Sequence, residues 1–436
     1  MSVQPAIFSS LEQWLVWQES LHPSSIDLGL ERVAAVWRLL QPQGLHSYVI
    51  TVGGTNGKGS CVAMLGAILR TAGYRVGMYT SPHLLRYNER INIHGNPVSD
   101  GALCAAFARI EQARTNISLT YFEFGTLAAL DLFGYAKLDV VILEVGLGGR
   151  LDAVNIIEPN LTLITTVDLD HTEWLGPDLE AIAREKAGIF RNGCPAIIGD
   201  VKPPNNLAKI AKEVGAPVFQ AGKDFHAKVY TDKWEWRGPT SSILDLPQPT
   251  LKSGKQVANA AAVLMLLDCA KQQLPVDAEA IRKGLTSVDL VGRLQVIPGA
   301  MTWILDVAHN PQAMANLAQD LAIMPASGPT HAIFACLADK NALDMVKVLA
   351  PQIDHWHLIP LLGPRSVPTA VLAQTLISAG IKNPVTQHVS AIDAVTSVLE
   401  YAQNKERVVV TGSFLTVAAV LKQIQPEDKD LATRGC

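Results

Sequence analysis

The chain has 436 residues, of which 48% are hydrophobic, and this is enough for two or three domains with large cores. Its 36 basic and 40 acidic residues give a net charge of −4, which provides no electrostatic case for nucleic-acid binding. The cysteines are scattered, which indicates reduced thiols and no disulfide framework. The first residues lack a signal-peptide pattern, and no apolar run reaches the length of a membrane span. We therefore expect a cytoplasmic protein.

Short β-branched segments alternate with helical patterns after an opening helical region at residues 11–40. This alternation predicts an α/β fold with a mostly parallel sheet. The strands expected in this part are Tyr48–Val52, Arg75–Tyr79, Asp139–Glu144, Leu161–Thr166 and Pro195–Ile198. The expected helices are Ser60–Thr71, Asp100–Arg114, Glu123–Ala136, Asp178–Arg191, Gln256–Gln272 and Asp277–Thr286. Residues 225–247, rich in Trp, Thr and Ser, predict a small antiparallel sheet.

Turn residues at both ends of Gly292–Gly299 indicate a hinge between two domains. Beyond it the alternation restarts, with strands expected at Trp303–Val307, His331–Ala335, His355–Ile359 and Arg407–Thr411, each followed by a helix. We therefore expect a P-loop-type domain at residues 1–295, which contains the small antiparallel region, and a smaller Rossmann-like α/β domain at residues 296–436.

A glycine-rich segment, Thr51–Ser60, joins the first expected strand to the helix that follows it. Its glycines allow backbone N–H groups to converge at a helix N-terminus, where anions are favoured, and Lys58 adds a positive charge. The segment therefore predicts a polyphosphate site, with the Ser60 hydroxyl available to magnesium. It departs from the usual P-loop because Gly59 separates the lysine from the serine.

Polar residues follow two further strands at their carboxyl ends, where parallel sheets bind ligands. Glu144 ends one strand, and His171 lies in the polar segment after the next. With Ser60 they would supply two oxygens and one nitrogen to a cation, although magnesium prefers oxygen and His171 could equally be a hydrogen-bonded core residue. Lys186 lies on the following helix, where nothing local distinguishes it from a solvated surface lysine.

The second domain offers its own polar residues at strand ends. Asp306, His309 and Asn310 close its first strand, so we expect them to face the interdomain cleft. Separately, His355 and His357 are two residues apart on a strand and would lie on one face, which could bind a metal ion. The sequence shows no third candidate ligand near them, so we do not expect a metal site there.

Several segments in this order resemble the Mur ligase superfamily, and most closely its branch of dihydrofolate and folylpolyglutamate synthases. The segments that carry the resemblance are Gly54–Ser60, Glu144–Asp152, Asp170–Gly176, Glu185–Ile189 and Asp306–Pro311, supported by His22–Leu30, Thr80–Leu84, Tyr121–Gly125 and Thr411–Phe414. The resemblance covers almost the whole chain. It implies an ATP-dependent amide ligase that adds L-glutamate to 7,8-dihydropteroate and to reduced folylglutamates through an acyl phosphate.

The resemblance also implies a cofactor set and a role for each matching residue. ATP would be contacted by Asn56, Gly57, Lys58, Gly59, Ser60, Asn259, Arg293 and Asp306. Magnesium, with two ions expected, would be held by Ser60, Ser81, Glu144, His171 and a carbamylated Lys186. The folate and glutamate substrates would be contacted by Thr120, Tyr121, Phe122, Glu123, Leu151, Asp152, Ala153 and Ser413. Lys58, Lys186 and His309 would be catalytic, a monovalent cation is a further candidate ligand, and the family precedent favours a monomer.

Other interpretations of the sequence remain open. The chain could have folylpolyglutamate synthase activity alone, or it could be another Mur-type ligase that joins amino acids to a cell-wall precursor. A regulatory P-loop NTPase is less well supported, because the nearest string to a guanine-reading motif, Asn404–Arg407, ends in the wrong residue. A dinucleotide dehydrogenase would depend on the glycines at 146–149, which lack the required spacing.

Overall fold

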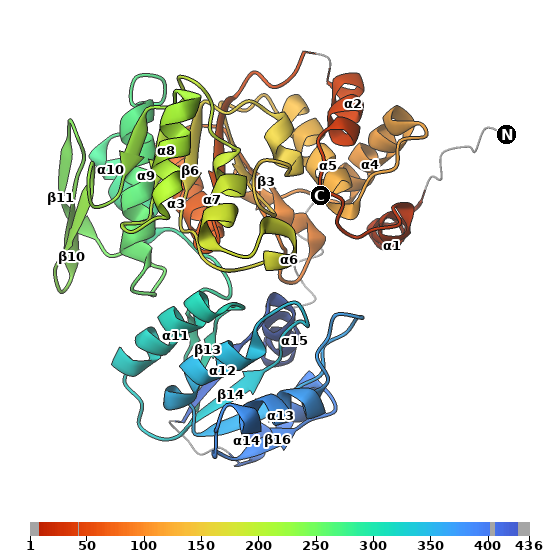
Figure 1. The fold of residues 1–436 in the computed structure, drawn as a ribbon, viewed down its shortest axis with the longest axis vertical. Helices are drawn as coiled ribbons and strands as arrows, with labels where there is room; N and C mark the ends of the chain where they lie inside the picture. The colour runs from red at the N-terminus through yellow and green to blue at the C-terminus, as the bar shows by residue number, and fades with distance from the viewer. Residues whose placement is uncertain (1–7, 42, 402–405, 426–436) are drawn as a thin grey trace. The chain divides into compact units, whose positions relative to one another are not determined.

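The structure is a computed structural model that describes residues 8–41, 43–401 and 406–425. The chain forms two compact units (Figure 1), of which the first contains the residues up to 250 together with 256–288. The second contains residues 251–255 and the chain from residue 289 onward. No helix in the described part of the chain combines the length and the apolar character needed to cross a bilayer.

The first unit is built on an eight-stranded sheet with the order β4-β3-β2-β5-β1-β6-β7-β8. Its parallel strands are β1 (Tyr48–Gly53), β2 (Val76–Tyr79), β5 (Val140–Glu144), β6 (Leu161–Ile164), β7 (Ala196–Ile198) and β8 (Val218–Gln220). At one end of the sheet, β3 (Ile91–Ile93) and the edge strand β4 (Asn96–Pro97) are antiparallel. A separate three-stranded antiparallel sheet contains β9 (His226–Val229), β10 (Lys233–Arg237) and β11 (Ser242–Pro247). The predicted mostly parallel sheet and small antiparallel region are confirmed.

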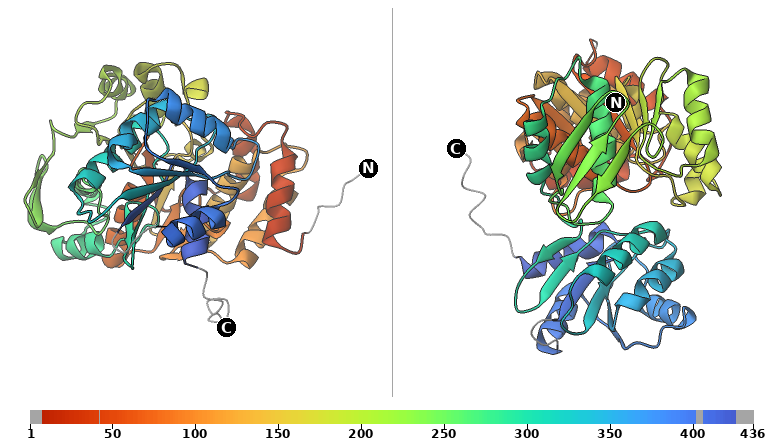
Figure 2. Two further views of the ribbon diagram at one scale, coloured as in Figure 1. Left: turned by 90° about the horizontal axis from the view of Figure 1, so that it is seen from below. Right: turned by 90° about the vertical axis from the view of Figure 1, so that its left-hand side faces the viewer.

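Helices cover both faces of the large sheet (Figure 2). They are α1 (Leu11–Leu21), α2 (Glu31–Leu40), α3 (Lys58–Thr71), α4 (Asp100–Arg114), α5 (Tyr121–Tyr135), α6 (Thr172–Leu175), α7 (Leu179–Ala187), α8 (Asn205–Val214), α9 (Gln256–Ala270) and α10 (Ala278–Thr286), with 3-10 turns η1 (Tyr87–Arg90) and η2 (Ala153–Ile156). Several begin at a side chain that accepts a backbone N–H, as expected for N-caps: Ser99, Thr120, Asp178 and Asp277.

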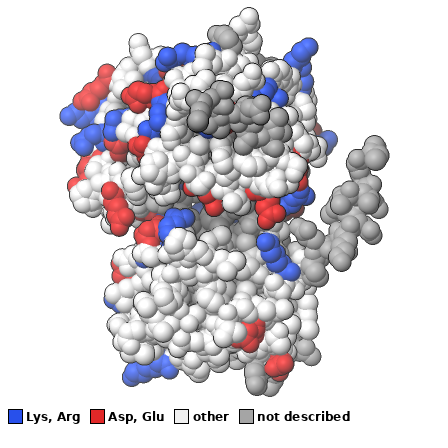
Figure 3. Space-filling model, turned by 90° about the vertical axis from the view of Figure 1, so that its right-hand side faces the viewer, with Lys and Arg blue, Asp and Glu red and all other residues white. Residues whose placement is uncertain are grey.

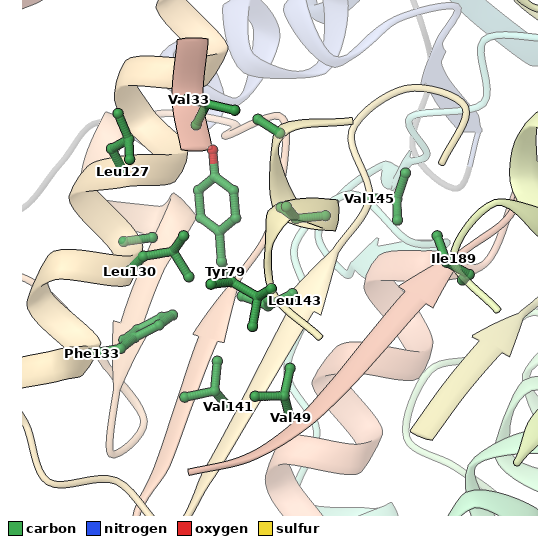
Figure 4. Close-up of a cluster of buried hydrophobic side chains, with 14 of the residues drawn as sticks. Val33, Val49, Tyr79, Leu127, Leu130, Phe133, Val141, Leu143, Val145 and Ile189 are labelled. Carbon is green, nitrogen blue, oxygen red and sulfur yellow. The ribbon is translucent and has the colours of Figure 1, made fainter. Parts of the chain in front are cut away.

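The core under α5 follows the two-residue alternation of the strands. Val49 and Val141 point to this face and pack with Tyr79, Leu130 and Phe133 (Figure 4). The opposite face carries α3 and α9, which pack against each other and against the sheet, and α10 packs on α3. Because α3 follows the glycine-rich loop directly, its packing fixes the position of that loop.

The second unit has a six-stranded sheet with the order β12-β13-β17-β14-β15-β16. The strands are β12 (Gln295–Ile297), β13 (Thr302–Leu305), β14 (Thr330–Phe334), β15 (His355–Leu358), β16 (Val385–Gln387) and β17 (Arg407–Thr411), all parallel except β12. The helices are α11 (Pro311–Ile323), α12 (Ala342–Leu349), α13 (Thr369–Ser378), α14 (Ala391–Tyr401) and α15 (Phe414–Ile424), with a 3-10 turn η3 (Ala350–Gln352). The predicted boundary between residues 295 and 296 would cut β12, whose pairing with β13 makes it part of this sheet.

The contact between α10 and α3 leads to a test of the fold. A Cβ atom placed on Gly284 would lie 2.5 Å from the Cα of Ile68 and 2.8 Å from its backbone nitrogen, so the two helices can approach closely only with glycine here. We expect Gly284→Ala to lower the free energy of unfolding by about 1–3 kcal/mol, as overpacking does, measured by urea denaturation.

Gly101→Ala is the matched control. Gly101 also lies in a helix, α4, but a Cβ there meets nothing within 4 Å. The higher helix propensity of alanine should leave this variant unchanged or more stable by up to about 1 kcal/mol. Equal stability of the two variants would contradict the close helix contact.

Candidate functional site

The glycine-rich loop lies between the end of β1 and the start of α3. Gly54 and Gly57 have φ angles of 140° and 89°, which side-chain-bearing residues rarely adopt, and Gly57 is the residue before the helix. The loop carbonyls of Gly54 and Thr55 accept hydrogen bonds from Lys58 Nζ at 3.0 and 3.2 Å. The Ser60 side chain is buried in the first turn of α3. The predicted phosphate-binding residues Asn56, Gly57, Lys58, Gly59 and Ser60 are thus gathered at one helix N-terminus.

Two threonines at the end of β6 hold this loop in place, and the sequence analysis missed them. Thr165 Oγ1 donates to the Asn56 carbonyl at 2.6 Å, while Asn56 N donates to Thr166 Oγ1 at 3.1 Å. The Thr55 amide donates to the carbonyl of Thr166 at 2.7 Å. Their sequence signal is only that polar residues follow a buried strand, which is common in proteins.

Adjacent parallel strands bring the candidate cation ligands to one edge of the sheet. The order β2-β5-β1-β6 places Ser81, Glu144, Ser60 and His171 just beyond the carboxyl ends of neighbouring strands or in the turns that follow them. Glu144 pairs in register with Val52 of β1, directly before the loop, and is only 4% exposed. His171 has a left-handed φ of 51° at the start of α6, and its amide donates to Asp170 Oδ1. These side chains offer hard oxygen donors and one imidazole, a set that fits magnesium.

Lys186 is not a solvated surface lysine, although its local sequence pattern did not distinguish it from one. It lies near the end of α7 and is only 4% exposed. Burial, reinforced by the positive charge of Lys58 and opposed by Asp170 and Asp152, lowers the pKa of its amine to about 7. A substantial part of the amine is therefore uncharged near neutral pH. Burial of its side chain depends on how α7 packs in three dimensions, which a local sequence pattern does not reveal.

The candidate folate-binding segments meet around the Gly146–Asp152 turn. A Cβ on Gly146 would lie 2.5 Å from Phe122 Cζ and 3.3 Å from Asp152 Oδ2, so this glycine lets the ring and the carboxylate approach the same backbone. Asp152 accepts the amides of Leu147 and Val154 at 2.8 and 3.0 Å, and burial raises its pKa to about 6. Leu151 and Ala153 flank Asp152 in the chain. The close approach of Phe122 to Gly146 therefore brings the predicted segments 120–123 and 151–153 together.

In the segment Thr120–Glu123, the first and last residues cap helix α5, and the two aromatic residues between them are partly exposed. Thr120 and Glu123 bond to each other's backbone amides as a capping box, and Glu123 also pairs with Arg32 at 3.1 Å. Tyr121 and Phe122 are only partly buried, so their rings remain available to a planar ligand. Arg32 was not predicted from the sequence, because it follows the segment His22–Leu30 and belongs to none of the family motifs.

Asn259 of α9 also lies beside the loop. Its Oδ1 would be 2.8 Å from a Cβ on Gly57, and its amide nitrogen donates to Gln256 Oε1 at 3.1 Å. This places the predicted ATP-contacting Asn259 within the same unit as the loop and next to it.

The remaining predicted residues gather at one edge of the second sheet, where β13 and β17 end side by side. Asp306 is half-buried and accepts the amides of Leu294 and Ala308 at 2.8 and 2.9 Å, and desolvation raises its pKa against the influence of Arg293. The Arg293 guanidinium lies over the Phe414 ring at 5.2 Å, and the His309 ring lies 5.9 Å from it. Ser413 caps α15 through the Thr416 amide.

On the face of the molecule drawn in Figure 3, basic and acidic side chains are interspersed over the first unit and sparse over the second. No broad basic patch of the kind that binds nucleic acid is seen on that face.

Comparison with known proteins agrees with these features. Residues 52–265 match the Mur ligase middle domain, and residues 292–414 match the Mur ligase glutamate ligase domain. A dihydrofolate synthase/folylpolyglutamate synthase of Escherichia coli K12 is 43% identical over 420 residues, covering 96% of this chain and 97% of its own length. The solved structure of E. coli FolC in complex with DHPP and ADP has a TM-score of 0.91 at 42% identity, covering 97% of this chain and 99% of its own.

A second solved structure, a bifunctional folylpolyglutamate synthase/dihydrofolate synthase with Mn, AMPPNP and L-glutamate bound, has a TM-score of 0.88 at 42% identity. It covers 98% of this chain and 100% of its own. The family predicted from the sequence motifs is confirmed: the chain belongs to the dihydrofolate synthase/folylpolyglutamate synthase family of Mur ligases.

Proposed function

We propose that the chain is an ATP-dependent ligase that joins L-glutamate to 7,8-dihydropteroate and to reduced folylglutamates through an acyl phosphate. The observation that carries this proposal is that the glycine–lysine loop and Glu144 lie at one sheet edge, with the buried Lys186 close enough for the charge of Lys58 to lower its pKa. The chain that carries them is 43% identical to a dihydrofolate synthase/folylpolyglutamate synthase. Solved relatives have been obtained with ADP, or with AMPPNP, Mn and L-glutamate, which supports ATP and a divalent cation as ligands here.

The two units divide the substrates in this proposal. The first unit, with the loop and Asn259, binds ATP and the folate substrate, and the second unit, with His309 and Ser413, receives glutamate. The match of residues 292–414 to a glutamate ligase domain supports this division. Arg293 and Asp306 are the residues of the second unit that the family resemblance assigns to ATP. We further propose a monomer in the cytoplasm that binds small molecules and neither nucleic acid nor membranes.

The first chemical step requires two negatively charged groups to approach each other. Lys58 and the loop amides would bind the β- and γ-phosphates and stabilise the oxygens on which charge develops. Ser60, Ser81, Glu144 and His171 would hold magnesium, which when bound neutralises further phosphate charge. The substrate carboxylate attacks the γ-phosphorus and ADP leaves; the glutamate amine then attacks the acyl carbon, and phosphate leaves. Tyr121 and Phe122 would bind the pterin ring.

A product analysis tests the proposed function. The protein is supplied with ATP, magnesium and glutamate together with dihydropteroate, a reduced folate or a nucleotide-linked muramyl acid. We expect the mass of one glutamate residue to be added to each of the first two acids and not to the third. Products from the folate alone would restrict the activity to folylpolyglutamate synthesis, and product from the muramyl acid alone would contradict the proposal.

Lys58 supplies a direct test of the phosphate site. Replacing Lys58 with alanine removes the cation from the loop, and loss of one charge-stabilising donor costs about 100-fold or more in kcat. Lys212→Ala, at an exposed position on α8, is the control and should retain activity. Near-normal turnover by Lys58→Ala, with the thermal melting of the wild type, would exclude this role.

Lys186 gives a pH-dependent prediction. A carbamate forms when the uncharged amine attacks CO2 and releases one proton. Because burial lowers the pKa of Lys186 to about 7, the reactive amine predominates above pH 7 and declines about tenfold per pH unit well below it. We expect a carbamate signal in 13C NMR with labelled bicarbonate at pH 8, weakening toward pH 6.

Lys186→Arg is the matched variant, because the guanidinium stays protonated and cannot form this carbamate. It should lack the signal and most ligase activity. A wild-type protein without the signal, or a variant that keeps full activity, would argue against a carbamylated Lys186.

A further inference from the structure

Three histidines from two neighbouring strands of the second unit form a cluster. His331 lies on β14, which Figure 1 labels, and His355 and His357 lie on β15, with His331 and His355 paired in register. Each of the three offers one ring nitrogen, and these atoms lie within 4.8 Å of one another. The expectation that His355 and His357 lack a third candidate ligand is therefore wrong. The third comes from the adjacent strand.

In His331 and His357, the ring nitrogens that face away from each other also have polar partners. His331 Nε2 lies 2.9 Å from the Glu406 carboxylate, and its Nδ1 lies 3.1 Å from His357 Nε2. His357 Nδ1 lies 3.0 Å from His388 Nε2, and His388 Nδ1 lies 3.3 Å from Asp393. Proteins use such outer partners to orient imidazoles that bind metal ions.

The row of hydrogen-bond contacts that runs from Glu406 through the histidines to Asp393 has too few hydrogens. The four contacts from Glu406 to Asp393 each need one hydrogen, but three neutral imidazoles supply three. When both carboxylates accept an N–H, the one hydrogen on His357 can serve only one of its two ring contacts, so His357 and either His331 or His388 face each other with two lone pairs. That contact needs a cation, either an extra proton or a metal ion.

The distances and the burial favour a metal ion over the proton. Two imidazole nitrogens bound tetrahedrally to zinc, at about 2.0–2.1 Å each, lie roughly 3.3 Å apart, close to the observed separation. His331 and His357 are only 8% and 3% exposed, whereas His355 is more open and gives an ion a way in.

We propose that His331, His355 and His357 form a binding site for a divalent transition metal ion, most suitably Zn2+, with Glu406 and the His388–Asp393 pair as supporting partners. Three nitrogen ligands suit zinc and leave a fourth position for water, whereas Mg2+ requires oxygen. The site is thus chemically distinct from the residues assigned to magnesium in the first unit.

The position of the cluster indicates a structural or regulatory role. His331 and His355 lie at the start of their strands, whereas Asp306, His309 and Ser413 follow the carboxyl ends of β13 and β17. The cluster is therefore at the opposite edge of the same parallel sheet. A bound ion would link β14 to β15 and need not take part in the ligase reaction.

The test is zinc binding by the full chain after treatment with a chelator. Excess Mg2+ and ADP are present so that the proposed magnesium ligands are occupied. Isothermal titration should show one Zn2+ per chain, and Co2+ should give the absorption of a nitrogen-ligated site. His357→Gln should lose this binding, and Glu406→Gln should weaken it about 10- to 100-fold, as loss of an outer partner does.

His226→Gln is the control, because His226 lies exposed on β9 of the other unit, and it should bind zinc as the wild type does. Zinc should raise the melting temperature of the wild type but not of His357→Gln, and ligase activity measured with Mg2+ and without zinc should be unchanged in that variant. Unaltered zinc affinity in His357→Gln would overturn the proposal. So would absence of zinc binding by the wild type, with 15N NMR showing an imidazolium in the cluster at neutral pH.

Discussion

The hydrogen bonds between the glycine-rich loop and the end of β6 are the constraint on which the rest of the first unit depends. A Cβ on Gly54 would lie 1.9 Å from Thr165 Oγ1, so the loop can approach this strand only as glycine. Thr165 and Thr166 bond the carbonyl and the amide of Asn56. The backbone amides after Asn56 then lie at the N-terminus of α3. A loop held in this way needs no rearrangement to receive a phosphate group, and such preorganisation is a large part of phosphoryl-transfer catalysis.

Around that loop the structure buries groups that would ordinarily be solvated. Glu144, Asp152 and Lys186 are each almost fully buried within the same unit. Burial shifts the two pKa values that bear on chemistry toward the uncharged forms, to about 6 for Asp152 and about 7 for Lys186. Burying an ionisable group lowers the stability of the protein. Such groups with shifted pKa values therefore cluster at functional sites, where the chemistry needs them. In the proposed function these residues share one purpose, the activation of a carboxylate away from water.

Much of this arrangement could be predicted from the sequence because it follows from local patterns. The glycine–lysine loop and Glu144 come directly after apolar strands, and parallel pairing carries such residues to one edge. Short strands such as β3 and β16 were not predicted, since three residues carry too little periodicity. Local patterns also fail for burial that depends on distant segments, as at Lys186. His331 joins His357 only through strand register, which a single sequence does not reveal.

The central claim is that this site phosphorylates the carboxylate of its acceptor substrate. The most direct measurement supplies dihydropteroate with both carboxylate oxygens replaced by 18O and determines the mass of the phosphate released during ligation. Because the acyl phosphate breaks at the acyl carbon when the glutamate amine attacks, one labelled oxygen should leave with each phosphate. Unlabelled phosphate would mean that water, not the carboxylate, attacks ATP, and would contradict the account.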